Sequence, residues 1–179
     1  MQTFGPAREL VEDPDFARAR AEVVGRLVLT DIDGPIRDLI ADIARLPHCF
    51  TLQSCHGHFV CRAGDEADHA DPIPIDHRGR VRYRIAYVAL CLEASERGRG
   101  LRAELARVPG IAPDLVQFGS PDWFWQQHVN SYALQVEPSA WQYDDEAQLE
   151  VGEARQVERA RDLFFGRLRA LVDAERRAR

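Results

Sequence analysis

The spacing of apolar residues changes along this chain, and each change marks an expected helix or strand. The clearest helical pattern places apolar residues at three- and four-residue intervals: Ile36, Leu39, Ile40, Ile43 and Leu46. Asp33 stands at an N-cap position before this run, Pro35 fits a first helical turn, and Pro47 ends the element. The pattern therefore predicts a helix between Asp33 and Pro47 with a buried apolar face.

Three more helices are expected, over about 13–24, 101–108 and 144–174, the last of them capped by Asp144 or Asp145. The first has an apolar face of Phe16, Ala17, Ala21 and Val24. The last has an apolar face of Val157, Ala160, Phe164, Leu168 and Leu171. Arginines cover the opposite side of this last helix, which is the pattern of a helix packed on a core.

Five segments have the composition of strands: 49–53, 59–61, 82–92, 115–118 and 131–136. The third has a long apolar centre, which is typical of a strand inside a sheet. Residues 62–81 are rich in Asp, Gly and Pro and predict a long polar loop, of a kind that often covers a binding site.

Helices and strands are interspersed without a regular βαβ order. The sequence therefore predicts a single α+β domain over residues 1–179, with one mixed β-sheet of four to six strands and helices packed on it. The sequence has no glycine-rich turn of the dinucleotide-binding type, which argues against a Rossmann nucleotide site.

The charge and the cysteines narrow the partners and the compartment. All 23 basic residues are arginine, and the net charge of −6 argues against a broadly basic nucleic-acid surface. A local patch remains open, because Arg78, Arg80, Arg82 and Arg84 alternate along one segment. The four cysteines show no paired framework, and the sequence has no long apolar run. We therefore expect a cytoplasmic protein with reduced thiols and no membrane contact.

Chemically reactive side chains concentrate in residues 51–61, TLQSCHGHFVC. Gly57 allows a positive φ and a close approach by a ligand. The imidazoles of His56 and His58 can exchange protons near neutral pH, and Cys55 becomes a nucleophile only if its pKa is lowered. In an extended strand Cys55 and His58 would face opposite sides, and a turn at Gly57 would break that rule.

Three interpretations of this segment remain open. It is an active or ligand site, in which Ser54 and backbone N–H groups donate and His58 acts as acid or base. Alternatively it is a metal site, with zinc as the expected ion, that uses some of Cys55, His56, His58, Cys61, His69 and His77. The Cys-x5-Cys spacing is not that of a zinc finger, so the preferred interpretation assigns no metal ligand. In the third interpretation Cys55 and Cys61 are small core residues and the histidines cap a turn.

Residues 33–58, DGPIRDLIADIARLPHCFTLQSCHGH, resemble the N-terminal part of the tRNA wybutosine-synthesizing methyltransferase family. In that family an Asp-led helix precedes a strand with the pattern T-[ST]-S-C-x-G-[RH]. The matching residues here are Asp33, Thr51, Ser54, Cys55 and Gly57. His58 stands where the family usually has arginine.

The resemblance implies an α+β fold, a site at the Ser-Cys-x-Gly turn, and S-adenosylmethionine-dependent methylation of a modified guanosine in tRNA. On this basis we expect Ser54, Cys55 and His58 to be catalytic. The alternative is a non-catalytic protein that binds a small molecule or a metal ion through the same turn.

Gly57 and His56 are candidates for ligand binding, and so are several residues outside the turn. Asp33 is either a helix cap or a ligand to the site, and Arg84 is either a solvated strand residue or a phosphate-binding fork. His128 and Asn130 lie between an aromatic segment and a strand, where they could support a ligand. Trp123, Phe124 and Trp125 in that segment could stack on a base, pack in the core, or form the contact of a homo-oligomer.

Overall fold

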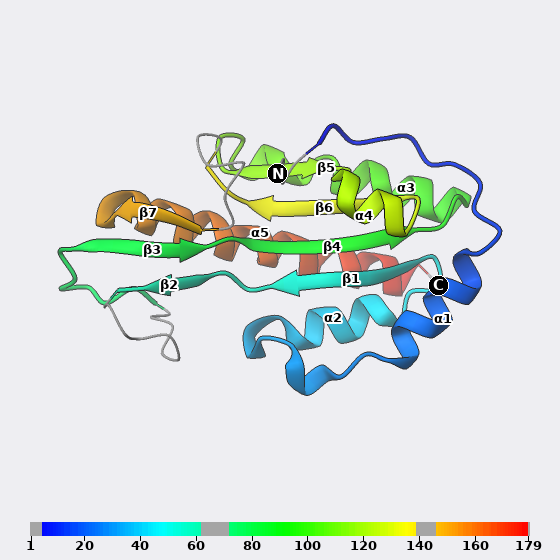
Figure 1. The fold of residues 1–179 in the computed structure, drawn as a ribbon, viewed down its shortest axis with the longest axis horizontal. Helices are drawn as coiled ribbons and strands as arrows, with labels where there is room; N and C mark the ends of the chain where they lie inside the picture. Colours follow the sequence, from blue (N-terminus) through cyan, green and yellow to red (C-terminus); the bar gives the residue numbers. More distant parts are fainter. Residues whose placement is uncertain (1–4, 62–71, 139–145, 179) are drawn as a thin grey trace.

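The computed structural model describes residues 5–61, 72–138 and 146–178. Their strands form two antiparallel sheets, one of four strands in the order β1-β4-β6-β5 and one of three in the order β2-β3-β7 (Figure 1). The strands are β1 Cys49–Cys55, β2 His58–Val60, β3 Arg80–Arg84, β4 Ala86–Leu92, β5 Val116–Gly119, β6 Ser131–Val136 and β7 Glu146–Glu150. The predicted α+β class is confirmed, with two antiparallel sheets in place of one mixed sheet.

The described residues also form five α-helices: α1 Phe16–Gly25, α2 Arg37–Ala44, α3 Glu96–Leu105, α4 Asp122–Gln127 and α5 Val151–Arg177. Three short 3-10 helices join them: η1 Leu29–Asp31, η2 Gly34–Ile36 and η3 Val108–Ile111. No helix in the described parts of the chain is long and apolar enough to cross a bilayer.

Two chain segments pass from one sheet into the other. The segment of β1 continues through His56 and Gly57 into β2, and the segment of β3 continues through Ile85 into β4 (Figure 1). The expected single strand over 82–92 is therefore two strands, interrupted at Ile85. We call residues 55–58 and 84–86 the junction, because both crossings lie side by side there. The expected internal position of this strand holds for β4, which pairs with both β1 and β6.

Helix α5 packs against one face of both sheets and supplies much of the core (Figure 1). Its predicted apolar residues are all buried: Val157, Ala160, Phe164, Leu168 and Leu171. The predicted face of the helix after Asp33 is buried as well: Ile36, Leu39, Ile40, Ile43 and Leu46. Burying each such large aliphatic side chain contributes about 1.5–3 kcal/mol.

The predicted face of α1 is partly wrong. Phe16 packs on Phe50 with its ring centroid 5.5 Å away, and Ala19, Val23 and Val24 pack with them. Ala17 and Ala21 are exposed instead of buried. The large Phe16 side chain sets the rotation of the helix, and an alanine gains too little from burial to oppose it.

Strand β7 was not expected, because residues 146–150 were assigned to the start of the last helix. Alternate side chains of β7 are buried, and the strand pairs with β3 from Arg80–Glu150 to Arg84–Glu146. Helix α5 begins only at Val151, and the expected caps Asp144 and Asp145 lie outside the described residues. The sequence EAQLE favours a helix locally, and pairing with β3 overrides that preference.

Helix α3 also begins earlier than expected, at Glu96. The Ser95 hydroxyl caps it by accepting a hydrogen bond from the Gly98 N–H at 3.2 Å. A Cβ atom at Gly98 would lie 1.9 Å from the Glu93 carbonyl oxygen. Glycine at this position therefore allows the close contact that starts the helix.

Candidate functional site

The side chains of Asp33, Cys55 and His58 converge at the junction. One oxygen, one sulfur and one ring nitrogen, each from a different residue of the three, all lie within 4.8 Å of one another. All three side chains are partly buried, with 30% of Asp33 and 16% of His58 exposed. The cluster is therefore reachable from solvent while its groups are held by the fold.

Gly57 brings Cys55 and His58 to the same side of the chain. Its φ of 85° is a left-handed conformation that interrupts the alternation of side chains along the strand. The His56 ring stacks on Phe165 of α5, with centroids 5.2 Å apart. The sequence left open whether a turn at Gly57 breaks the extended pattern, and the positive φ of Gly57 shows that it does.

Asp33 joins the site through the backbone of the turn. Its Oδ2 atom accepts a hydrogen bond from the His56 N–H at 2.7 Å, and the Nε2 atom of His58 lies 3.5 Å from the same oxygen. Asp33 occupies the N-cap position of η2 but makes no side-chain capping bond there. The simple capping role is therefore wrong, because the turn offers this carboxylate a backbone donor.

The Cys55 thiol is protonated at neutral pH. Burial raises its pKa to about 11, and the negative charge of Asp33 adds to the rise. The Gly57 N–H points at the Cys55 sulfur from 3.4 Å and opposes the shift. A thiol in this state is a weak nucleophile, and a bound metal ion would remove its proton.

Ser54 lies in β1 beside Cys55, and Arg84 lies in β3, in the other sheet. Ser54 precedes Cys55 within β1, and because side chains alternate along a strand the two lie on opposite faces. Arg84 is directly opposite His58 in the β2–β3 pairing, and its Nε atom donates to Glu146 at 2.6 Å. The cationic group beside His58 is thus already paired with a carboxylate of β7. The predicted roles of Ser54 in catalysis and of Arg84 in ligand binding stay predictions.

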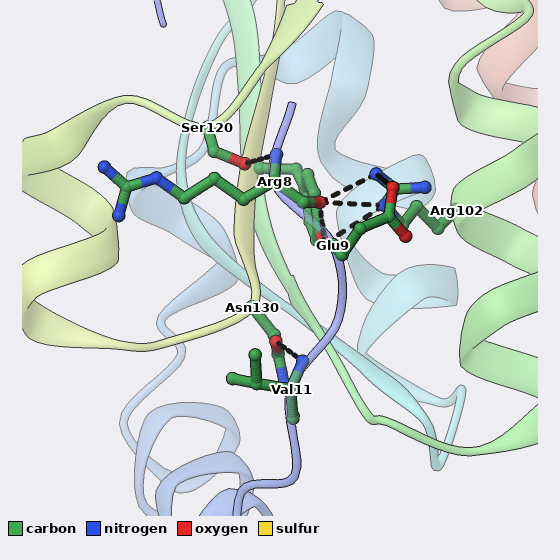
Figure 2. Close-up of polar contacts among 7 residues, drawn as sticks. Arg8, Glu9, Val11, Arg102, Ser120 and Asn130 are labelled. Carbon is green, nitrogen blue, oxygen red and sulfur yellow. Dashed lines mark hydrogen bonds and ion pairs between the residues drawn. The ribbon is translucent and has the colours of Figure 1, made fainter. Parts of the chain in front are cut away.

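His128 and Asn130 lie at the other end of the four-stranded sheet. The His128 ring packs edge-on against Phe50, five residues before Cys55 along β1, a separation of about 16 Å for an extended chain. The Asn130 side chain is fully buried and binds the backbone of Val11 in both directions (Figure 2). The structure does not bring these two residues to the turn, and their role in ligand binding stays a prediction.

The bonds to Asn130 are part of a wider set that holds the N-terminal segment on the domain. The Val11 N–H donates to the Asn130 Oδ1 atom at 2.8 Å, and the Asn130 amide donates to the Val11 carbonyl at 2.7 Å. The Arg8 N–H binds the Ser120 hydroxyl, and the Arg8 carbonyl accepts from Arg102 (Figure 2). The hydrogen bonds to Val11 satisfy the buried Asn130 amide, so its burial needs no bound ligand to explain it.

The aromatic segment is divided between core and surface. Trp125 packs against the core and meets Tyr132 edge-on at 6.1 Å, whereas 56% of Trp123 is exposed. The guanidinium of Arg8 lies 4.9 Å from the centre of the Trp125 ring. Core packing is therefore observed for Trp125, and Trp123 remains a candidate for a stacking or oligomer contact.

The other candidate zinc ligands lie away from the cluster. Cys61 is half-buried just beyond β2, and His77 lies 3.4 Å from the Arg80 carbonyl oxygen. His69 is outside the described residues. All four cysteines are free thiols, as expected. Within the described ranges the one group that meets the geometric criterion for a metal site is Asp33, Cys55 and His58.

Two residues of α5 that pack behind the turn were not predicted from the sequence. Arg161 of α5 is 1% exposed and approaches the Gly57 carbonyl, and Phe165 stacks on His56. One sequence signal pointed to Arg161: it falls within the apolar spacing of α5, between Val157 and Phe164.

Comparisons with known proteins give no family. No protein-family model and no curated protein matches this chain. Among solved structures, the PH1069 protein from Pyrococcus horikoshii is similar with a TM-score of 0.43 and 13% identity, over 90% of this chain and 93% of that one. A hypothetical protein from Aeropyrum pernix is similar with a TM-score of 0.39 and 12% identity, over 81% of this chain and 96% of its own.

Proposed function

We propose that this chain is an enzyme that uses S-adenosylmethionine to methylate a modified guanosine in tRNA, with its centre at Asp33, Cys55 and His58. One observation carries the proposal. The residues of the family resemblance lie in two stretches of sequence, and these stretches meet where Asp33 accepts the His56 N–H at 2.7 Å. Asp33, Cys55 and His58 come from these two stretches, and their ligand atoms lie within 4.8 Å of one another, which is the kind of convergence that an active site requires.

The groups of the cluster suit methyl transfer. The Asp33 carboxylate complements the positive sulfonium of the methyl donor, and 30% of its side chain is exposed to meet it. An acceptor nitrogen loses a proton as it gains the methyl group, and His58 is the residue of the cluster that can take it. Asp33 lies 3.5 Å from His58 Nε2 and so favours one orientation of the ring.

Binding of S-adenosylmethionine, measured by titration calorimetry on the purified chain, tests this proposal. We expect saturable binding to the wild type, a loss of at least about tenfold in affinity in Asp33→Ala, and a smaller loss in Asp33→Asn, which keeps an acceptor for the His56 N–H. Arg155→Met is the matched control, because Arg155 bonds the carbonyls of Pro74 and Ile75 instead. An absence of binding at millimolar ligand would reject the proposal.

A second candidate function is non-catalytic binding of a zinc-class metal ion. The convergence of Asp33, Cys55 and His58 within 4.8 Å supports it directly. Carboxylate oxygen, thiolate sulfur and imidazole nitrogen are all ligands that zinc accepts, and three protein ligands leave a fourth position open. Binding would expel the thiol proton from Cys55, so affinity is expected to rise with pH.

Elemental analysis of the purified chain, followed by titration with zinc chloride, separates the two candidates. Metal binding predicts about one equivalent of zinc, lost in both Cys55→Ser and His58→Ala. Cys61→Ser is the matched control, since Cys61 lies outside the cluster. Less than about one-tenth equivalent after saturation and desalting would exclude a tight site.

A further inference from the structure

Arg161 is a buried charge on the apolar side of α5. It is 1% exposed and ranks among the largest fully buried side chains of the described residues. Moving a guanidinium out of water costs several kcal/mol unless its groups find partners. A leucine at this position would follow the pattern of the helix, so the position of Arg161 calls for a physical reason.

The guanidinium points at the back of the turn. Its Nη1 atom lies 3.4 Å from the Gly57 carbonyl oxygen, and its central carbon lies 5.1 Å from the centre of the Phe59 ring. Its Nε and Nη2 atoms donate to one oxygen of Asp162 at 3.1 and 2.9 Å. Arginine is suited to this arrangement, because its planar fork bonds in two directions while its face stacks on an aromatic ring.

The contacts continue from Arg161 through the junction to the far side of Gly57. The Phe59 ring stacks on Tyr83 with centroids 4.8 Å apart. The Tyr83 hydroxyl accepts the Ala86 N–H at 2.9 Å and donates to the Val136 carbonyl at 2.8 Å. Ala86 in turn lies against Gly57, where an added Cβ would come within 2.7 Å of the Ala86 Cβ. The turn is thus enclosed from the helix side and from the sheet side.

We propose that Arg161 is a positioning residue that holds the Gly57 turn in the conformation in which Cys55 and His58 lie on one side. It acts through the turn: its Nη1 atom is at the Gly57 carbonyl, whereas the ligand atoms of the cluster belong to Asp33, Cys55 and His58. The functional importance of this role rests on the proposed function, because the site it organises is the one assigned there. The geometric role itself does not depend on which ligand binds.

Hydrogen exchange of backbone amides, followed by NMR, reads the turn directly. The His56 N–H is bonded to Asp33, and the Gly57 N–H points at the Cys55 sulfur, so both are protected only while the turn keeps its shape. In Arg161→Met we expect both amides to exchange at least about tenfold faster, while amides in the centre of β4 keep their rates. Arg161→Lys should restore part of the protection, since it keeps the charge without the planar fork.

The control is Arg155→Met, which removes an arginine of the same helix that bonds Pro74 and Ile75. It should leave the His56 and Gly57 amides unchanged. Equal acceleration of all amides in Arg161→Met would show a general loss of stability and overturn the proposal, as would unchanged rates at the turn. If Arg161→Met does not fold, the same comparison is made with Arg161→Lys, in which selective acceleration at the turn supports the proposal and its absence overturns it.

The exchange measurement also separates this proposal from the proposed function. Failure to bind S-adenosylmethionine or zinc would reject the assigned ligands and leave the exchange result standing. Conversely, normal ligand binding with uniform exchange rates in Arg161→Met would reject the positioning role alone.

Discussion

The carboxylate of Asp33 accepts a hydrogen bond of 2.7 Å from the backbone N–H of His56, 23 positions later in the chain. This bond joins the segment before α2 to the crossing between the two sheets. A hydrogen bond to a charged acceptor is worth about 1.5–3 kcal/mol, more than a neutral one. Asp33 thus contributes both a functional group and part of the structure that holds the site together.

Gly57→Ala, which adds a single methyl group at the junction, should strongly destabilise the fold. The new Cβ would meet the Ala86 Cβ at 2.7 Å, and the φ of 85° is unfavourable for alanine. We expect a loss of about 2–4 kcal/mol in the free energy of unfolding, measured by urea denaturation. Gly100→Ala is the control: it lies in α3 with nothing within 4 Å of the added Cβ, and should be stabilising by about 0.5–1 kcal/mol. A cost at Gly57 no larger than at Gly100 would contradict the geometry of the turn.

Alkylation of Cys55 by iodoacetamide should be slow at neutral pH and should accelerate strongly in base. Because burial raises the pKa of this thiol to about 11, its rate constant should climb about tenfold per pH unit through pH 9. Residues 46–62 form one tryptic peptide that holds both Cys55 and Cys61, so fragmentation of this peptide by tandem mass spectrometry is needed to assign the label to Cys55 and not to Cys61, which is also partly accessible. A rate that levels off below pH 9 would show that the thiol ionises more easily than its burial implies. Zinc, if it binds, should protect Cys55 and leave Cys61 reactive.

Asn130→Ala should loosen the N-terminal segment. The substitution removes both bonds to Val11 and leaves alanine at a φ of 63°, in a buried position. We expect a loss of about 2–4 kcal/mol in the free energy of unfolding and faster trypsin cleavage after Arg8. Asn130→Gly accommodates the backbone but lacks the amide, so it should recover about 1 kcal/mol while cleavage stays fast. Equal cleavage rates in wild type and both variants would show that the segment is held by other contacts.

His48 should make the fold sensitive to mild acid. Its ring is 2% exposed, and Nε2 lies 3.2 Å from the Glu175 carboxylate, an ion-pair distance without the alignment of a hydrogen bond. Burial lowers the pKa of His48 below its ordinary 6.5, against the opposing effect of Glu175. The unfolded chain therefore binds this proton more readily than the folded one. The stability that neutral His48 contributes is complete above pH 6.5 and is lost as the pH falls below it, with a slope of at most about 1.4 kcal/mol per pH unit.

The measurement for His48 is urea denaturation of wild type and His48→Gln between pH 5 and pH 8. The difference in unfolding free energy between the two proteins should change below pH 6.5 and stay constant above it. A difference that is independent of pH, or that favours the wild type increasingly in acid, would contradict the lowered pKa.

The sequence predicted elements where side-chain size and spacing agreed. The helix after Asp33 has five large aliphatic residues on one face, and all five are buried. Strand β7 was missed because Glu146, Gln148 and Glu150 favour a helix locally, and only the pairing with Arg80 to Arg84 reveals the strand. Such pairing joins segments more than 60 residues apart, which no local pattern encodes.

The site was predicted in part for the same reason. The concentration of Cys55 and His58 in one segment was evident from the sequence, but strand geometry left open whether a turn at Gly57 brings the two side chains to the same side. The sequence could not decide whether the Asp33 carboxylate caps a helix or joins the site, because that depends on the position of the His56 N–H in the folded chain. His128 and Asn130 were chosen as candidates because they are polar and lie next to an aromatic segment in the sequence. In the structure they lie at the other end of the four-stranded sheet from the site.

The chain crosses between the two sheets twice, at Gly57 and at Ile85, and both crossings lie in the junction that contains the candidate site. Cys55 is the last residue of β1, in the four-stranded sheet, and His58 is the first residue of β2, in the three-stranded sheet. The distance between their side chains is therefore a measure of how one sheet is oriented on its neighbour. Any change that twists the three-stranded sheet against the four-stranded one acts on the spacing of the reactive groups, even when it occurs at the far end of β7.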